Sequence, residues 1–285
     1  MKNKKTAILL ATYNSEKYIG AQIDSLLQQT YKDWILYVRD DCSTDKTPDI
    51  LRKYKNLYPN KIMILDNYGQ SLKAYRNFVD ILQRVESDYY LFCDHDDVWL
   101  PNKVEISINR IIELERQNTG KPIIVHTDMK VVDQNLNVIC NSFWKFSNLL
   151  PDNSTFEEMV LCNSANGCAM AFNNQAKKVS LPNIEYATMH DMLLNQSVSA
   201  QDGIILAIHT PTVLYRQHAN NVVGACRRNF WFYVKKMMSP IKILQDNLKC
   251  WRMANGIKNI SIFSFCLTKI RVQYLKRKVK YDEYE

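Results

Sequence analysis

Residues 89–101, YYLFCDHDDVWLP, hold an apolar, β-favouring run that ends abruptly in acid. The run stops at Asp94, and two more carboxylates follow at Asp96 and Asp97. Carboxylates this close together repel one another and raise one another's pKa. The arrangement makes physical sense if a cation binds there or if one of the acids takes part in chemistry. The alternative is a structural loop whose acids cap the helix that follows and favour its positive N-terminal dipole.

The first half of the chain alternates short apolar runs with segments of helical periodicity. Strands are expected at residues 6–11, 34–38, 61–65, 89–93 and 122–126. Helices are expected at residues 15–29, 47–55, 72–85 and 101–116. This alternation predicts an α/β fold, with a Rossmann-like, mainly parallel sheet and helices on both faces. Ligands of such sheets bind beyond the carboxyl ends of the strands, where this sequence has its polar clusters.

The second half of the chain has a looser pattern. Residues 166–173, NGCAMAFN, favour a loop that enters a strand, and residues 189–200 favour a helix. Residues 215–224, YRQHANNVVG, are polar and show no helical period.

The composition is that of a globular protein. The chain has 285 residues, of which 46% are hydrophobic and 23% charged, enough for a sizeable core. The apolar run after the basic start MKNKK is shorter than the ~7–15 residues of a secretory signal. No run approaches the ~18–20 apolar residues that span a bilayer. None of the cysteines forms a C-x-x-C pair, so free thiols in a reducing compartment are expected rather than disulfides or a zinc site.

The net charge of +8 is concentrated at the carboxyl end. Residues 227–285 contain 14 Lys or Arg and 4 Asp or Glu, a net of +10, which leaves −2 for residues 1–226. The predicted division is therefore a folded domain at 1–226 and a basic, amphipathic helical tail at 227–285. Basic amphipathic helices bind anionic membrane surfaces, and this tail also carries the aromatic run 230–233. One alternative is a helix packed on the domain with a solvated basic face; another is nucleic-acid binding, for which no groove-reading motif is present.

The acids at 94–97 allow more than one chemistry. Oxygen ligands suit Mg²⁺ or Mn²⁺, which bind through one or two carboxylates plus substrate phosphates. The stretch also fits the D-x-D-x-[TV] motif of haloacid dehalogenase-type phosphatases, with Asp94 as the nucleophile and Val98 as its last member. Those enzymes place the motif on their first strand, whereas here a long βαβ segment precedes it.

A second acidic turn, DDCSTDKT at 40–47, follows the strand expected at 34–38. It lacks the Gly and Glu of an EF-hand loop, and the chain has no glycine-rich phosphate loop. A bound nucleotide would therefore be held by carboxylates on its ribose and base, with a metal ion on its phosphates.

Several of these pieces, in this order, resemble glycosyltransferase family 2, the inverting nucleotide-sugar transferases with a GT-A fold. They are A-T-Y-N at 11–14, L-Q-Q-T-Y at 27–31, V-R-D-D-C-S-T-D at 38–45, N-Y-G at 67–69, R-N at 76–77, C-D-H-D-D-V-W at 93–99, N-G-C-A-M-A-F-N at 166–173, H-D at 190–191 and Y-R-Q-H-A-N-N-V-V-G at 215–224. The D-D-V-W-L-P and Y-R-Q-H pieces look like the bacterial rhamnosyltransferase branch. The likeness covers residues 5–226.

The resemblance implies roles for particular residues. Asp191 would be the general base that deprotonates the acceptor hydroxyl. The metal ligands would be Asp94, Asp96 and His218. The residues that bind the nucleotide sugar would be Thr12, Tyr13, Asp40, Asp41, Arg76, Asp94 and Arg216. Within that set Thr12 and Tyr13 would line the base pocket, and Asp41 would contact the base or the ribose.

The resemblance also implies an activity. The chain would move a sugar, with rhamnose favoured, from a nucleoside-diphosphate donor to a hydroxyl of a glycan or polyprenyl-linked acceptor in bacterial surface polysaccharide assembly. Mg²⁺ or Mn²⁺ would be the cofactor, and the protein would be cytoplasmic, held at the inner face of the cell membrane by its tail, with no nucleic-acid partner. The alternatives are a UDP-glucose or UDP-galactose transferase of the same fold and a non-catalytic nucleotide-sugar-binding subunit.

Two positions depart from the family pattern. Cys42 stands where glycine is usual, so the turn there could differ. His190 stands where an acid often precedes the base, and it is either an ordinary polar surface residue or the next candidate for the base.

Overall fold

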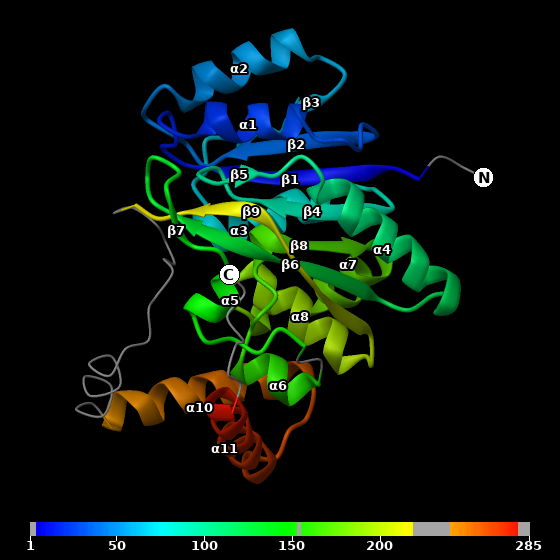
Figure 1. Ribbon diagram of the computed structural model, residues 1–285, viewed down its shortest axis with the longest axis vertical. Coiled ribbons are helices and arrows are strands. Elements are labelled where there is room, and N and C mark those ends of the chain that lie inside the picture. Colours follow the sequence, from blue (N-terminus) through cyan, green and yellow to red (C-terminus); the bar gives the residue numbers. More distant parts are fainter. Residues whose placement is uncertain (1–3, 153–154, 219–239, 279–285) are drawn as a thin grey trace.

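The computed structural model describes residues 4–152, 155–218 and 240–278, and Figure 1 shows its elements in sequence colours. The strands are β1 (Thr6–Thr12), β2 (Trp34–Asp40), β3 (Ile62–Ile64), β4 (Tyr89–Cys93), β5 (Val98–Trp99), β6 (Ile123–Val132), β7 (Val138–Cys140), β8 (Met170–Asn173) and β9 (Ile204–Arg216). The α-helices are α1 (Ile19–Leu27), α2 (Thr47–Leu57), α3 (Lys73–Arg84), α4 (Lys103–Gln117), α5 (Phe143–Phe146), α6 (Phe156–Leu161), α7 (Asn174–Ser180), α8 (His190–Ala200), α10 (Pro240–Ile257) and α11 (Ile262–Lys278). The 3₁₀ segments are η1 (Gly167–Ala169) and η2 (Leu181–Tyr186).

The strands form one sheet in the order β3-β2-β1-β4-β8-β6-β9-β5, and β7 pairs with β6. The first four strands of this order are mutually parallel, as the sequence predicts. Strand β8 runs antiparallel to both β4 and β6, so the second half of the sheet is mixed. The chain moves outward from β1 through β2 to β3 and then returns to place β4 on the other side of β1. The carboxyl ends of β1 and β4 are therefore a topological switch point, where α/β sheets bind ligands.

Helices cover both faces of the sheet because its inner strands alternate two sets of apolar side chains. Ile8 and Leu10 of β1 point into a core that helices α1, α2, α4 and α5 cover. Ala7 and Leu9 of the same strand point into a second core, which α3, α7 and α8 cover. Burying a side chain of this size contributes about 1.5–3 kcal/mol, so two apolar faces favour a strand between two helical layers. The predicted α/β class with helices on both faces is confirmed.

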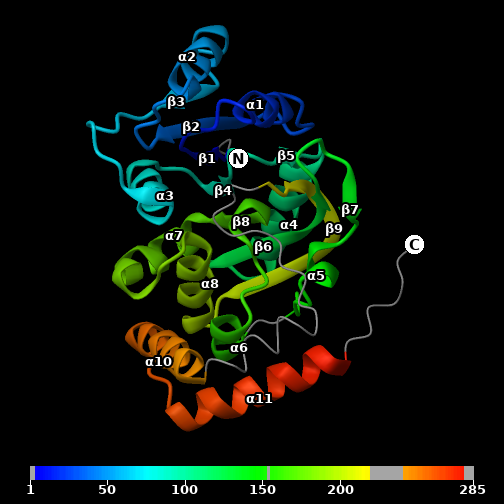
Figure 2. The same cartoon turned by 90° about the vertical axis from the view of Figure 1, so that its left-hand side faces the viewer.

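The carboxyl-terminal helices lie at the end of the molecule opposite α2, and Figure 2 shows α10 and α11 side by side there. They pack on α6, and α10 also contacts α8. A small apolar core joins them to the domain through Phe156 and Val160 on one side and Ala254, Ile260 and Phe265 on the other. Within the described residues, no helix combines the length and apolar character needed to cross a bilayer. Each cysteine that the structure describes is a free thiol, as the sequence predicts.

Candidate active site

The end of β1 and the end of β2 meet at one carboxylate. Thr12 and Asp40 are register partners of the two strands, and the Thr12 hydroxyl donates to Asp40 at 2.8 Å. Ser43 donates to the same carboxylate from its backbone N–H at 2.8 Å and from its hydroxyl at 2.6 Å. Tyr13 next to Thr12 is 51% exposed. A hollow of about 380 Å³ opens beside Asp40, with Asn67 among the residues that line it.

Asp41 is buried, and its carboxylate accepts several hydrogen bonds from the segment that leads into α3. Its carboxylate accepts from Arg39 at 3.0 Å, from the hydroxyl of Ser71 at 2.8 Å and from the backbone N–H groups of Leu72 and Lys73 at 2.6 and 2.9 Å. Burial alone would raise the pKa of this carboxyl, but these donors hold it below its usual value. In the structure Asp41 anchors the start of α3, and its contact with the base or ribose stays a prediction.

The turn after Asp41 keeps a conformation that favours glycine. Cys42 has a φ of +63°, in the left-handed region where a side chain costs roughly 1–2 kcal/mol. The backbone at this position therefore has the positive φ that glycine adopts freely, although a cysteine occupies it.

The acids after β4 lie close together and are partly or fully buried. Asp94 is half-buried, and Asp96 and Asp97 are buried. Burial, followed by the charges of Asp96 and Asp191, raises the pKa of Asp94 to about 7. Burial and the same kind of repulsion raise the pKa of Asp97 well above its usual value. A cation bound here would remove this repulsion.

Hydrogen bonds connect the end of β9 to these acids. Arg216 donates its backbone N–H to the Asp97 carboxylate at 3.0 Å and its Nε–H to the Asp96 carbonyl at 2.7 Å. His218 Nε2 lies 2.9 Å from Asp96 Oδ2. The Tyr18 ring stacks on His218 with centroids 4.7 Å apart, and the Arg216 guanidinium lies 4.7 Å above it. The structure thus brings the predicted site residue Asp96 together with Arg216 and His218, which lie 120 and 122 positions further along the chain.

The donor set fits a divalent cation. Asp96 and His218 supply a carboxylate oxygen and an imidazole nitrogen at one point, and Asp94 is a second carboxylate in the same loop. Among the described residues, the group of possible ligand atoms within 4.8 Å of one another belongs to Asp94, Asp97 and Cys168, which shares only Asp94 with the predicted metal ligands. The carboxylate oxygens are the ligands that Mg²⁺ and Mn²⁺ prefer, whereas a thiol is not.

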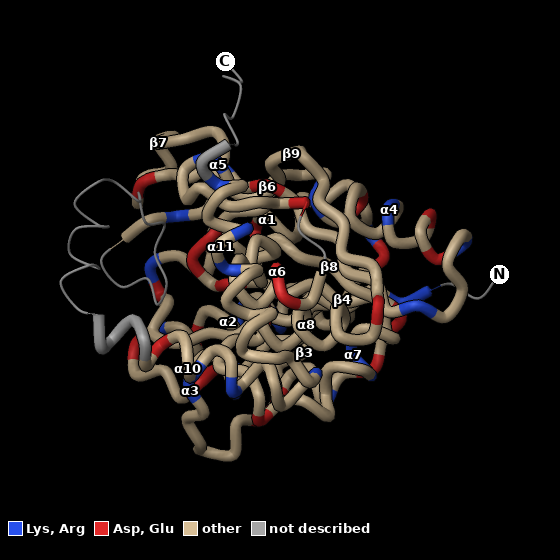
Figure 3. Tube along the Cα trace, turned by 90° about the horizontal axis from the view of Figure 1, so that it is seen from below, with Lys and Arg blue, Asp and Glu red and all other residues tan. Residues whose placement is uncertain are grey.

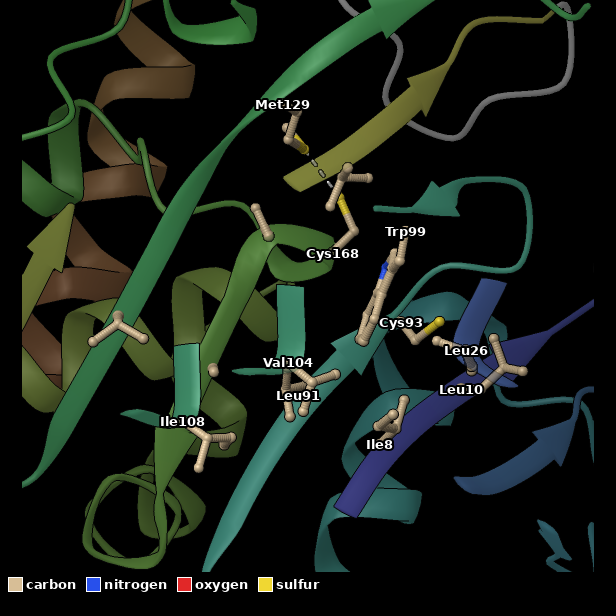
Figure 4. Close-up of a cluster of buried hydrophobic side chains, with 14 of the residues drawn as sticks. Ile8, Leu10, Leu26, Leu91, Cys93, Trp99, Val104, Ile108, Met129 and Cys168 are labelled. Carbon is tan, nitrogen blue, oxygen red and sulfur yellow. Dashed lines mark hydrogen bonds between the residues drawn. The ribbon is translucent and has the colours of Figure 1, made fainter. Parts of the chain in front are cut away.

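Cys168 was not among the predicted site residues. Its thiol is buried, donates to Met129 Sδ at 3.4 Å and has a pKa raised well above the usual value, mainly by burial. Figure 4 shows it pointing toward Met129, in the same buried cluster as Trp99 and Cys93. The signal in the sequence was the NGCAMAFN motif, but nothing local indicated that its cysteine reaches the acids.

Asp191 lies in the first turn of α8 and is 8% exposed. Its carboxylate accepts from Asn163 Nδ2 at 3.0 Å and from the backbone N–H of Met192 at 2.7 Å. Asn195 holds Asn163 in turn by donating to its side-chain oxygen at 2.5 Å. Burial raises the pKa of Asp191 to about 6, and several hydrogen bonds to its carboxylate, those of Met192 and Asn163 first, lower it in part. The charge of this group helps to raise the pKa of Asp94, and its role as the general base stays a prediction.

His190 is not a surface residue. Its ring is buried, with its centroid 4.0 Å from that of Phe78 and 4.6 Å from that of Phe92. A Cβ added at Gly167 would collide with this ring, which explains the glycine of the NGCA stretch. Burial lowers the pKa of His190 to about 3, so the ring is neutral and packs as part of the core.

Arg76 forms an ion pair with Glu185 in the structure. Its guanidinium donates to both carboxylate oxygens of Glu185, at 3.0 and 2.9 Å, on the exposed surface between α3 and η2. A role for Arg76 in binding the nucleotide sugar stays a prediction.

The fold and the carboxylates at its switch point define an α/β protein whose candidate ligand site lies beyond the carboxyl ends of β1 and β4. The chain belongs to glycosyl transferase family 2, whose family model matches residues 7–170. This confirms the family that the sequence motifs indicate.

Two curated relatives illustrate the likeness. The dTDP-rhamnosyl transferase RfbG of Shigella flexneri is 28% identical over 226 residues, which cover 76% of this chain and 74% of that protein. The UDP-Glc:alpha-D-GlcNAc-diphosphoundecaprenol beta-1,3-glucosyltransferase WfgD of Escherichia coli is 33% identical over 108 residues, 38% of this chain and 41% of that protein. The match therefore spans most of the first relative but less than half of the second.

Solved structures agree on the fold. TarS of S. aureus, residues 1–349 in complex with UDP-GlcNAc, superposes with a TM-score of 0.55 at 19% identity, covering 95% of this chain and 77% of that one. The mannosyltransferase PcManGT of Pyrobaculum calidifontis, in complex with GDP-Man and Mn²⁺, gives a TM-score of 0.50 at 14% identity, covering 96% and 70%. At such identities the likeness supports the GT-A fold, and it confirms the fold prediction.

Proposed function

We propose that this glycosyltransferase moves a sugar, with inversion, from a nucleoside-diphosphate donor to a hydroxyl of a glycan or lipid-linked acceptor in bacterial surface polysaccharide assembly. The observation that carries the proposal is geometric: His218 Nε2 lies 2.9 Å from Asp96 Oδ2, and Asn163 donates to the buried Asp191 carboxylate at 3.0 Å. The first pair would suit a cation, and the carboxylate of Asp191 would suit a proton transfer. The family membership supports the same class of reaction.

Asp191 is the proposed general base. Asn163 donates to its Oδ2 and the Met192 N–H to its Oδ1, so the carboxylate is fixed in orientation at the start of α8. With a pKa of about 6 the group is mostly ionised at neutral pH and accepts the proton of the acceptor hydroxyl as that oxygen attacks the sugar. Attack on the face opposite the leaving diphosphate inverts the anomeric carbon in one displacement and needs no covalent intermediate.

The donor side is proposed to use the ends of β1, β2 and β4. Thr12 and Asp40 are mutually fixed by a hydrogen bond, and Tyr13 is exposed beside them, where a base and ribose would lie. Asp94, Asp96 and His218 would hold Mg²⁺ or Mn²⁺. When bound, such a cation neutralises the charge that develops on the leaving diphosphate.

Arg216 contributes to the donor side through its position. It is anchored by the Asp96 carbonyl at 2.7 Å and the Gln134 carbonyl at 2.7 Å, over the Tyr18 ring. This fixes a permanent positive charge beside the acid loop, where a diphosphate would lie.

Rhamnose is the proposed sugar, carried by dTDP. The match to the dTDP-rhamnosyl transferase extends over about three quarters of both chains, whereas the match to the glucosyltransferase covers 38% of this chain. A UDP-hexose is the second candidate, because the glucosyltransferase matches at the higher identity within its shorter range.

The test is a screen of the purified chain with nucleotide sugars and Mg²⁺ or Mn²⁺. Slow release of dTDP from dTDP-rhamnose, lost in EDTA and lowered by orders of magnitude in Asp96→Ala, supports both the donor and the cation. Release of UDP alone reverses the order of donors. Donor binding with no turnover in the presence of any hydroxyl acceptor would indicate a non-catalytic nucleotide-sugar-binding subunit instead. Turnover that EDTA leaves unchanged would contradict the metal dependence.

The place of action is proposed to be the cytoplasmic face of the cell membrane, with a polyprenyl-linked acceptor. The basic composition of residues 227–285 supports this, since a net charge of +10 favours an anionic surface.

A further inference from the structure

The ring of Tyr18 lies against the two side chains that the end of β9 brings to the acids. Its centroid is 4.7 Å from that of the His218 imidazole, and the planes of the two rings are inclined by 26°, which is a stacked arrangement. The guanidinium of Arg216 lies 4.7 Å from the same centroid. His218 in turn reaches Asp96 through Nε2, at 2.9 Å. The proposed mechanism gives the Tyr18 ring no part, yet the ring touches the imidazole that would bind the cation.

The backbone at Tyr18 is fixed by a turn at the start of α1. Tyr18 is the N-cap residue of this helix, and its N–H and that of Ile19 donate to the Ser15 carbonyl at 2.9 and 3.0 Å. Ser15 is buried, and its own N–H donates at 2.8 Å to the hydroxyl of Thr47, the first residue of α2. The Tyr18 carbonyl accepts from the Gln22 N–H at 3.2 Å. The ring therefore projects from a backbone position that two helices hold, and it offers a fixed surface to the side chains that lie on it.

The imidazole of His218 lies just beyond the end of its strand. Strand β9 ends at Arg216, where its ladder with β6 also ends at Val132, and the Gln217 N–H still donates to the Val132 carbonyl at 2.8 Å. Beyond that point the orientation of the His218 ring depends on the contacts of its side chain, and the stacking on Tyr18 is one of them. Contacts that orient a ligating imidazole typically change metal affinity by roughly 10–100-fold. The Tyr18 ring is therefore placed where it can affect the binding of a cation without being a ligand.

The same ring attracts two positively charged side chains. Lys17 Nζ lies 5.0 Å from the Tyr18 centroid, so Lys17 and Arg216 both approach the ring. The face of a tyrosine ring is negative and attracts cations within about 6 Å of its centroid. Both cations also contact Gln134, between β6 and β7: Lys17 Nζ lies 3.5 Å from its side-chain oxygen, and Arg216 donates to its carbonyl at 2.7 Å. Basic and acidic residues are mixed along the chain in the view of Figure 3, so we attribute this concentration of cations to the ring.

We propose that Tyr18 is a positioning residue of the candidate cation site: its ring holds the His218 imidazole in the orientation in which Nε2 meets Asp96. The inference rests on the proposed function for the identity of the two ligands, but its test needs no donor, acceptor or turnover. Without the aromatic ring the imidazole would populate other orientations. When only a fraction of the molecules presents both ligands to one point, the apparent affinity for the cation falls by that fraction.

The experiment measures Mn²⁺ binding to full-length variants by electron paramagnetic resonance, without donor or acceptor. Tyr18→Leu keeps a large apolar side chain and removes the aromatic ring, whereas Tyr18→Phe keeps the ring and removes only the hydroxyl. We expect Tyr18→Leu to weaken Mn²⁺ binding about tenfold and Tyr18→Phe to change it by less than about twofold. Tyr58→Leu is the matched control, because Tyr58 is a tyrosine that follows the end of α2 and is 40% exposed. This control should bind Mn²⁺ as the wild type does.

A double-mutant cycle with His218→Ala separates this role from a general loss of structure, because residues that act through one another have non-additive effects. Tyr18→Leu should weaken Mn²⁺ binding much less in the His218→Ala background than in the wild type. Equal effects of Tyr18→Leu in both backgrounds would overturn the proposal, and so would a Tyr18→Leu variant with wild-type affinity.

The imidazole resonances of His218, assigned by their loss in His218→Ala, provide a second measurement that needs no metal. A proton above an aromatic ring is shielded, so Tyr18→Leu should move these resonances downfield and Tyr18→Phe should leave them in place. Resonances that stay in place in Tyr18→Leu would show that the two rings do not stack, and would overturn the proposal. A wild type that binds no Mn²⁺ would overturn both the proposed cation and this inference. Absence of sugar transfer, with Mn²⁺ binding and the coupling intact, would contradict the proposed function and leave this inference standing.

Discussion

At the scale of single residues, the proposed mechanism depends on one buried carboxylate that must stay ionised. Asp191 is 8% exposed, and its hydrogen bonds to Asn163 and to the Met192 N–H hold it in one orientation. Asp191→Asn keeps the size of the side chain and removes its basicity. We expect transfer to fall ~10²–10⁴-fold, the usual contribution of a general base. Donor affinity, measured by calorimetry, should remain within a few-fold of the wild type.

The matched control for that variant is Asn163→Ala. It leaves the basicity of Asp191 in place and removes the donor that orients it. Its loss of rate should be smaller than that of Asp191→Asn. If Asp191→Asn transfers sugar at nearly the wild-type rate, Asp191 is a structural residue of α8, and His190 cannot replace it because its buried ring has a pKa of about 3.

The raised pKa of Asp191 gives the reaction a dependence on pH. Burial moves this pKa upward to about 6, so the carboxyl gains its proton as the pH falls through that value. Only the ionised form accepts the acceptor's proton, and the rate should therefore decline below about pH 6 and level off above it. The measurement is the rate of transfer at saturating donor and acceptor from pH 5 to 8. A rate that is flat across this range would show that ionisation of Asp191 does not limit transfer.

At the scale of elements, Asp41 connects β2 to the start of α3. Its side chain and that of Arg39 are 4% and 2% exposed, and they form an ion pair at 3.0 Å. Asp41→Ala removes one partner of this buried pair and leaves two backbone donors, those of Leu72 and Lys73, without their acceptor. Removing one partner of a buried ion pair costs about 3–5 kcal/mol when the other charge is left unpaired. Because Arg39 keeps Asp80 at 3.1 Å, we expect a loss of stability at the lower end of that range, about 3 kcal/mol, in urea unfolding.

The control is Asp49→Ala on α2. Asp49 also pairs with an arginine, Arg52, but their side chains are 71% and 66% exposed. A pair this exposed contributes about 0–1 kcal/mol, so this variant should unfold close to the wild type. Equal stability of the two variants would mean that the Asp41 network does not hold α3 in place, and Asp41 would then be free for the predicted contact with the nucleotide.

The helices and strands also show how much of the fold the sequence could predict. Segments with a strong period were found close to their observed bounds: the strand expected at 89–93 is β4, and the helix expected at 72–85 is α3 (Lys73–Arg84). Strand β9 (Ile204–Arg216) was not predicted, because its sequence IILAIHTPTVLYR includes a proline and its exposure follows no simple alternation. Strand β5 has only two residues, and nothing local marks them as a strand.

The site was predictable in its residue types and less so in its contacts. Three acids after a buried strand indicated a cation or a catalytic group from their mutual repulsion alone. The partners of those acids come from far along the chain: Arg216 reaches Asp97 across 119 positions, and His218 reaches Asp96 across 122. Cys168 and Tyr18 have no local signal of this kind, because only the fold brings a thiol or a ring to the acids.

At the scale of the whole molecule, the division at residue 226 stays a prediction that a truncation can test. Helices α10 and α11 are joined to the domain through a core that includes Phe156 and Val160 on one side and Phe265 on the other. A chain that ends at residue 226 would expose these two domain side chains to water. At about 1.5–3 kcal/mol for each fully buried side chain, the loss of stability is at most roughly 3–6 kcal/mol.

We therefore expect the chain truncated at residue 226 to melt below the full-length protein in a scan monitored by circular dichroism. Phe156→Ser with Val160→Ser in the truncated chain is the control. Those substitutions replace the apolar surface that truncation exposes, so they should restore solubility without restoring the melting temperature. If the truncated chain melts with the full-length protein, the domain and the tail are independent units. If it melts lower, the packing of α10 and α11 on α6 stabilises the domain, and the division at residue 226 does not separate independent units.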